Sequence, residues 1–225
     1  MKLAVLFTGG KDSTYAAYLA KKDGHQISCL LTIESENKES YMFHTPNISF
    51  TQLQAESMNL PLLSRITKGI KEKELSDLKK LIREAVKKFG IEGVITGAIA
   101  SVYQASRVQQ ICADLHLWCF NPLWLKDQKA YLQELLEAGF KTIIISVSAY
   151  PLNQYFLGKE IDQKMINILN RLGQKHQFNP AGEGGEMETF VTNCPLFSKK
   201  IIIKKSKIIY KNNSGTLLIE EAWLK

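Results

Sequence analysis

The sequence has little cysteine, and its four cysteines are scattered. Cys29, Cys112, Cys119 and Cys194 form no Cys-x-x-Cys pair. This spacing argues against a structural zinc site, an iron–sulfur cluster and a disulfide framework. We therefore interpret the four side chains as buried, reduced thiols.

Long hydrophobic runs are also missing. Only five apolar residues separate Lys2 from Thr8, too few for the core of a signal peptide, and no stretch reaches the length of a membrane span. We expect a cytoplasmic protein with no membrane partner. With 225 residues, 45% of them hydrophobic, the chain can build one ample α/β core and a second, smaller unit.

Acidic residues are absent from Ser198 to Ile219, a segment that carries six lysines. Lysines on a strand edge discourage pairing between sheets, whereas a basic face can also dock an acidic protein or an RNA. Tyr210 is the one aromatic residue interleaved with these lysines, and RNA is commonly bound on several stacked rings. The segment is therefore interpreted as a solvated edge, and no nucleic-acid partner is expected.

The most informative segment covers residues 3–13, where an apolar strand turns through two glycines into a helix. Gly9 and Gly10 let an anion approach the main-chain N–H groups, and the helix points its positive end at the same place. Lys11 adds a full charge. The spacing is not that of a Walker A loop. This pattern predicts a nucleotide phosphate site, and the alternative is a plain strand-to-helix turn. Asp12 and Ser13 are expected to cap the helix.

Apolar strands and amphipathic helices alternate from this loop as far as Trp124. Further strands are expected at residues 26–33, 62–66, 94–96 and within 118–124, with helices at 50–60, 75–89 and 102–115. This alternation predicts an α/β fold: a parallel five-stranded, Rossmann-like sheet with helices on both faces and the first strand at its centre.

In such a sheet the ligand binds outside the carboxyl ends of the strands, where the winding direction switches. The ends of strands one, two and four should therefore surround the nucleotide, which places Ile33, Thr96, Gly97 and Ala98 near it. The main chain beside Ile33 is expected to contact adenine, and Gly97 to permit close approach of ribose or phosphate. Each of these positions could equally be an ordinary strand end.

The pattern changes after residue 124. A helix that ends at Gly139, a strand at 142–147, and a second helix that ends at Gly173 are followed by short strands at 201–203, 207–210 and 216–220. We divide the chain into a nucleotide-binding α/β domain, residues 1–124, and an α+β domain, residues 125–225, which we expect to bind the substrate.

Three glutamates and three glycines alternate within residues 182–188. A strand from Met187 would place Glu186 and Glu188 on one face. Carboxylates beside a polyphosphate could bind Mg²⁺, hold an ammonium ion or act as a base. The alternative is a surface turn with solvated acids.

Five blocks of the chain occur in a characteristic order: Thr8 to Ser13, Glu34 to Asn47, Gly97 to Val108, Asn121-Pro-Leu-Trp, and Gly182 to Thr189. Together they resemble the diphthine ammonia ligase family of the PP-loop ATP pyrophosphatases, in its short archaeal form. The resemblance implies that ATP adenylates the carboxylate of diphthine, a modified histidine of translation elongation factor 2. Pyrophosphate and then AMP leave, and ammonium supplies the nitrogen of diphthamide. Mg²⁺ and oriented N–H groups would stabilise the departing pyrophosphate.

Position in the fold and this resemblance together assign roles to residues. ATP binding is expected at Thr8, Gly9, Gly10, Lys11, Asp12, Ser13, Ile33, His44, Thr96, Gly97 and Ala98. Substrate binding is expected at Tyr103, Gln104, Arg107, Gly184, Gly185, Glu186, Glu188 and Thr189. Catalysis is expected to use Lys11, Asp12, Arg107, Glu183, Glu186 and Glu188, with Asp12 also a Mg²⁺ contact. Arg107 could equally be a structural ion-pair partner.

Two other functions stay open. A PP-loop enzyme could modify tRNA, but tRNA thiolases need catalytic cysteines, and Cys112, Cys119 and Cys194 show no obvious pair. A nucleotide-binding sensor could share the sheet without cleaving ATP.

Overall fold

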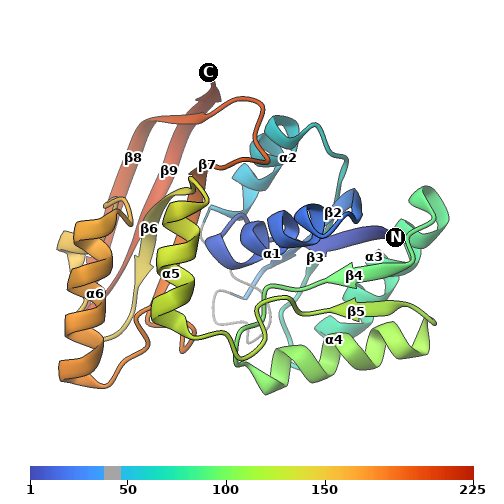
Figure 1. The fold of residues 1–225 in the computed structure, drawn as a ribbon, viewed down its shortest axis with the longest axis horizontal. Helices are drawn as coiled ribbons and strands as arrows, with labels where there is room; N and C mark the ends of the chain where they lie inside the picture. The colour runs from blue at the N-terminus through green and yellow to red at the C-terminus, as the bar shows by residue number, and fades with distance from the viewer. Residues whose placement is uncertain (38–46) are drawn as a thin grey trace. The chain divides into compact units, whose positions relative to one another are not determined.

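Two β-sheets organise the part of the chain that the computed structural model describes, residues 1–37 and 47–225 (Figure 1). The residues around them group into two units, Met1–Trp124 and Leu125–Lys225. No helix in these described residues combines the length and the apolar character that a membrane crossing requires.

The first unit holds a fully parallel sheet with strand order β3-β2-β1-β4-β5. Its strands are β1 (Lys2–Leu6), β2 (Gln26–Ser35), β3 (Leu62–Thr67), β4 (Gly93–Ile95) and β5 (Trp118–Phe120). The predicted five-stranded sheet with a central first strand is confirmed. Because the winding direction reverses between β1 and β4, their carboxyl ends mark the expected ligand edge.

Helices cover both faces of this sheet (Figure 1). They are α1 (Lys11–Lys22), α2 (Thr51–Met58, preceded by the 3₁₀ turn η1, Ile48–Phe50), α3 (Glu74–Phe89) and α4 (Val102–Asp114). α3 and α4 share one apolar cluster with the sheet, in which Leu81 and Ile82 of α3 and Val108 of α4 are buried. In Figure 1, α1 lies on the opposite face. As predicted, α3 ends at Gly90, whose left-handed backbone (φ 61°) closes the helix.

The second unit holds an antiparallel sheet with order β7-β6-β9-β8, and α5 and α6 lie on one of its faces (Figure 1). Its elements are α5 (Gln128–Glu137), β6 (Lys141–Val147), the 3₁₀ turn η2 (Gln154–Phe156), α6 (Gln163–His176), β7 (Met187–Asn193), β8 (Ile201–Lys211) and β9 (Ser214–Leu224). The smaller α+β unit that the sequence predicts is therefore present.

Two details of the second unit differ from the prediction. Residues 201–203 and 207–210 are one continuous strand, β8, which the β8–β9 ladder carries through a register shift at Lys205. α6 does not end at Gly173 but runs on to His176. A Cβ atom on Gly173 would lie 2.9 Å from the Phe178 carbonyl oxygen, so this glycine serves the close return of the chain after the helix.

Candidate functional site

The phosphate-loop segment joins β1 to α1 through two glycines with different backbones. Gly9 has φ 77°, the left-handed region that favours glycine, and Gly10 is the extended N-cap of α1. The prediction that Asp12 and Ser13 cap the helix is wrong, because the helix begins at Lys11 and places both in its first turn. A glycine N-cap has no side-chain oxygen for the first-turn amides, which suits an anion in that position.

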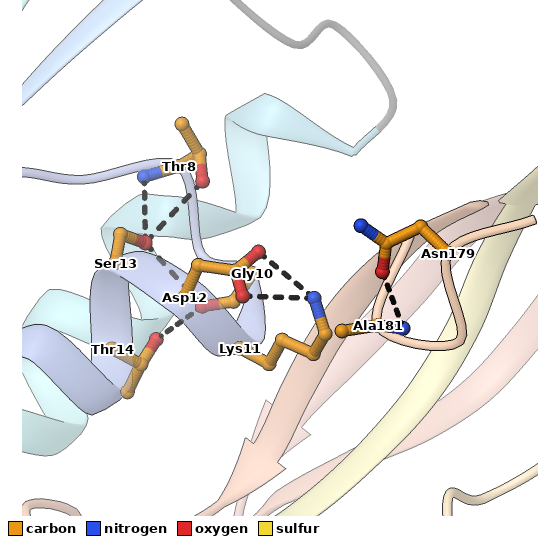
Figure 2. A network of polar contacts seen from close by, with 8 residues as sticks. All are labelled: Thr8, Gly10, Lys11, Asp12, Ser13, Thr14, Asn179 and Ala181. Carbon is orange, nitrogen blue, oxygen red and sulfur yellow. Dashed lines mark hydrogen bonds and ion pairs between the residues drawn. The ribbon is translucent and has the colours of Figure 1, made fainter. Parts of the chain in front are cut away.

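Hydrogen bonds hold the two glycine carbonyls from inside the protein. Thr14 Oγ1 donates to the Gly10 carbonyl oxygen at 2.7 Å, and Gln54 Nε2 of α2 donates to that of Gly9 at 2.9 Å (Figure 2 shows the first). Ser13 Oγ also lies 3.3 Å from both the amide nitrogen and the hydroxyl of Thr8. The negative ends of both glycine carbonyls are thereby bound by protein donors, which lowers their repulsion of a phosphate.

Lys11 and Asp12 form an ion pair at the start of α1 (Figure 2). Lys11 Nζ lies 2.8 and 2.9 Å from the two Asp12 carboxylate oxygens. The lysine side chain is only 3% exposed, whereas that of Asp12 is 33% exposed. A buried ammonium next to a helix N-terminus is therefore held in place by one partly accessible carboxylate.

The donor set fits a metal that arrives with the nucleotide. Among residues 1–37 and 47–225, no group of three His, Cys, Asp or Glu side chains could hold a metal ion. Mg²⁺ is commonly bound by one or two carboxylates together with substrate phosphates, and Asp12 offers one such carboxylate at the loop.

The tip of β4 packs against the start of α1. A Cβ atom on Gly97 would lie 2.7 Å from the Ser13 amide nitrogen and from the Asp12 carbonyl carbon. Glycine at position 97 therefore leaves room for the backbone of α1, which packs closely against it. Thr96 is hydrogen-bonded through its hydroxyl to the Asn121 side chain. This bond joins the ends of β4 and β5 beside the loop.

Two further predicted nucleotide contacts, Ile33 and Ala98, have buried side chains, so only their main-chain groups suit a ligand. His44 lies outside the described residues. The contacts of Ile33, Thr96, Gly97 and Ala98 with a nucleotide stay predictions.

Tyr103 and Arg107 lie in the first two turns of α4 and share one partner, Glu72. Arg107 donates to Glu72 Oε1 from Nε (3.2 Å) and Nη2 (3.0 Å), and the Tyr103 hydroxyl donates to the same oxygen at 3.1 Å. The hydrogen bond from Arg107 lowers the pKa of the Glu72 carboxyl. Burial, followed by the contact with Glu72, raises the pKa of Tyr103. Gln104, also predicted here, uses its amide to bond the N-cap hydroxyl of Ser101.

The ion-pair alternative for Arg107 is therefore observed, and its partner was missed in the sequence. Glu72 lies in the loop between β3 and α3, 35 residues before Arg107, with a left-handed backbone (φ 66°). No spacing rule connects a loop residue to a helix that distant along the chain. Gln54 was missed for the same reason.

The acidic glycine segment belongs to the second unit and leads into β7 at Met187, as predicted. Glu186 lies one residue before the strand, and its Oε1 accepts a hydrogen bond from the Asn179 amide at 2.9 Å. The Asn179 side chain in turn accepts from the Ala181 amide at 3.0 Å (Figure 2). The Glu186 side chain thus binds the backbone at the start of the loop that leads into β7.

The other residues predicted in this segment differ in exposure. Glu183 and Glu188 are half-buried, Gly184 and Gly185 are exposed, and Thr189 is buried on β7. The roles of these residues in binding or catalysis stay predictions.

All four cysteines are free, and Cys29, Cys112 and Cys194 are buried as expected, whereas Cys119 is only partly buried. Cys112, at the end of α4, and Cys119, on β5, are hydrogen-bonded to each other, and this bond together with burial raises the pKa of the Cys112 thiol. Burial raises the pKa of Cys29 and of Cys194 to about 12, which makes both poor nucleophiles. Cys112 and Cys119 meet where α4 ends and β5 begins, at the amino ends of the strands, away from the loop between β1 and α1.

Comparisons with known proteins cover both units. The family described as diphthamide synthase N-terminal domain matches residues 1–118, and diphthamide synthase C-terminal domain matches residues 127–224. A diphthine–ammonia ligase of Bos taurus is 37% identical over 228 residues, covering 93% of this chain and 85% of its own length. A Danio rerio protein of the same name is 35% identical, with 96% and 91% covered.

A solved structure gives a weaker likeness. It is a predicted subunit of tRNA methyltransferase from Methanocaldococcus jannaschii, at 17% identity and a TM-score of 0.45, covering 87% of this chain and 98% of that one.

Proposed function

The chain belongs to the diphthamide synthase family, and from this we propose that it is an ATP-dependent ligase that amidates diphthine on translation elongation factor 2. The observation that carries the proposal is the match of both family domains, in order, over nearly the whole chain. The geometry of the loop between β1 and α1 supports it, because that loop suits the phosphates of ATP. A substrate of the translation machinery would place the reaction in the cytoplasm.

The proposed reaction has two steps. The diphthine carboxylate attacks the α-phosphorus of ATP, the bond between the α and β phosphates breaks, and pyrophosphate leaves. Ammonia then attacks the acyl carbon, a C–N bond forms, AMP leaves and one proton is released. Ammonium is the proposed nitrogen source.

Residues 8–13 are proposed to bind the pyrophosphate part of ATP. Charge that develops on the leaving group would meet the first-turn amides of α1 and the ammonium of Lys11. Asp12 would hold Mg²⁺, and the ion would supply additional positive charge. Because the Lys11–Asp12 pair is already formed, Lys11 needs little rearrangement to act.

The two units are proposed to divide the work. Residues 1–124 would bind ATP, and Tyr103, Gln104 and Arg107 would meet an oxyanion of the nucleotide or of the substrate. Residues 125–225 would bind the protein substrate. Within this unit, three glutamates are proposed to bind ammonium: Glu183, Glu186 and Glu188. Gly184, Gly185 and Thr189 are proposed to bind the substrate.

The experiment mixes the protein with ATP, ammonium and elongation factor 2 that carries diphthine. We expect AMP and pyrophosphate to appear only when the modified factor is present, and ¹⁵N from ammonium, rather than from glutamine, to enter the product. Formation of ADP, or AMP release that depends on tRNA and not on the factor, would overturn the proposal. No nucleotide cleavage at all would favour a sensor.

A further inference from the structure

One carboxylate oxygen gathers three hydrogen bonds at the carboxyl edge of the first sheet. Glu72 Oε1 accepts from the Tyr103 hydroxyl and from Nε and Nη2 of Arg107, at 3.0–3.2 Å. These donors come from α4, whereas Glu72 comes from the loop before α3. Two separate elements are therefore joined at a single atom.

The guanidinium of Arg107 is held from two directions. Its central carbon lies 5.0 Å from the centre of the Tyr103 ring, a cation–π distance, while Glu72 takes the edge formed by Nε and Nη2. Arginine has five N–H donors in a fixed plane. Glu72 leaves the second edge, formed by Nη1 and the other N–H of Nη2, unoccupied, and the Arg107 side chain is 40% exposed.

This second edge has the geometry that suits an oxyanion. Two parallel N–H groups of a guanidinium bind a phosphate or a carboxylate with two hydrogen bonds. Glu72 follows the carboxyl end of β3, and α4 follows that of β4, so the cluster lies along the same edge of the sheet as the phosphate loop.

The simpler explanation is an exposed ion pair, which commonly adds little to stability. Two observations favour a role in positioning Arg107 over a plain surface contact. Glu72 adopts φ 66°, a conformation that is costly for a residue other than glycine. All three donors also converge on one oxygen, an arrangement that fixes the guanidinium plane more than a single exposed contact would.

We propose that Glu72 is a positioning residue: it holds Arg107 by the Nε–Nη2 edge so that the Nη1–Nη2 edge is ready to bind an oxyanion of the substrates. The inference rests on the proposed ligase function. The oxyanion is either the α-phosphate of the nucleotide or a carboxylate of the protein substrate.

The kinetic test uses Glu72→Gln and Glu72→Ala. We expect Glu72→Ala to raise the KM of one substrate about tenfold, because a misplaced binding group weakens binding, and Glu72→Gln to restore part of the loss. A change in the KM for ATP identifies the phosphate, and a change in the KM for the modified factor identifies the carboxylate.

A matched control is Asp114→Asn. It breaks the ion pair between Lys79 of α3 and Asp114, the last residue of α4, a contact that involves neither Glu72 nor Arg107. We expect both KM values to stay unchanged in this variant. If Asp114→Asn raised KM as Glu72→Ala does, or if Glu72→Ala left both KM values unchanged, the proposal would be wrong.

A double variant tests whether Glu72 acts through Arg107. In an Arg107→Met background, Glu72→Ala should have no further effect on KM, because nothing is left to position. If the changes in KM caused by Glu72→Ala and by Arg107→Met multiplied in the double variant, the proposal would be contradicted.

A third measurement does not depend on the reaction. Tyr103 faces Glu72, Arg107, Lys71 and, at longer range, Glu74, and loss of the Glu72 charge should lower the pKa of Tyr103. Ultraviolet titration of Glu72→Gln, with Tyr103→Phe as reference, measures this pKa. An unchanged pKa of Tyr103 would show that Glu72 does not contact Tyr103 and Arg107 as described, whether or not the ligase function holds. A lowered pKa with an inactive wild-type protein would reject the ligase function alone.

Discussion

Two acid–base pairs lie along the carboxyl edge of the first sheet. Lys11 and Asp12 are adjacent in sequence, and the lysine side chain is 3% exposed. Glu72 and Arg107 are 35 residues apart, and their side chains are 51% and 40% exposed. Burial strengthens the electrostatic effect of the first pair and raises the cost of breaking it, whereas water screens the second. The first pair therefore suits charge stabilisation, and the second suits orientation.

The largest expected effect comes from removing the buried charge with Lys11→Met. We expect AMP formation in a single turnover to fall by roughly 10²–10³, as for the loss of one donor to a developing negative charge. Lys22→Met, in the last turn of the same helix, is the control and should keep wild-type activity. A fall of less than about tenfold in Lys11→Met would place Lys11 outside the chemistry.

Asp12→Asn breaks the buried pair from its other side. The ammonium of Lys11 would then face a neutral amide, and we expect a loss of about 1–3 kcal/mol in the free energy of unfolding, measured in urea. Bound ATP should reduce this loss, because its phosphates supply a new counter-charge. Asp23→Asn, at the exposed end of α1, should change little. An equal loss with and without ATP would argue against phosphate binding at Lys11.

Gly97→Ala tests whether the end of β4 holds the start of α1, which carries Lys11 and Asp12, in position. Its Cβ would lie 2.7 Å from the Ser13 amide nitrogen, so the start of α1 has to shift. We expect a destabilisation of about 1–3 kcal/mol, typical of overpacking, and weaker ATP binding by calorimetry. Wild-type stability and affinity in this variant would show that β4 does not fix the loop.

The smallest effect is expected from the exposed pair. Arg107 lowers the pKa of Glu72 in the folded state, so the pair stabilises the fold at neutral pH and loses that contribution as the pH falls through the lowered pKa. In Arg107→Met the pKa of Glu72 should return toward its usual range, which a carbon-13 NMR titration measures. The melting temperature at neutral pH should stay within experimental scatter. A large drop in melting temperature would instead give the pair a structural role.

Local patterns allowed much of this protein to be predicted. The alternation of strands and helices predicted the parallel sheet, and the strand–glycine–helix pattern predicted the loop, because each depends on neighbours within a few residues. The same rules failed at Gly173, where a close return of the chain, and not helix termination, explains the glycine. They also failed at Cys112 and Cys119, which a tight turn between α4 and β5 brings together.

The amino-acid sequence by itself determined the fold class, the glycine turn between β1 and α1, and the family resemblance, because glycine backbone freedom, helix periodicity and motif order are local properties. Only the tertiary structure decided that Gln54 holds the Gly9 carbonyl, that Gly97 admits the backbone of α1, and that Glu72 holds Arg107. Each of these contacts joins segments that are far apart along the chain. Their distances depend on how whole helices pack on the sheet, which no short pattern of residues encodes.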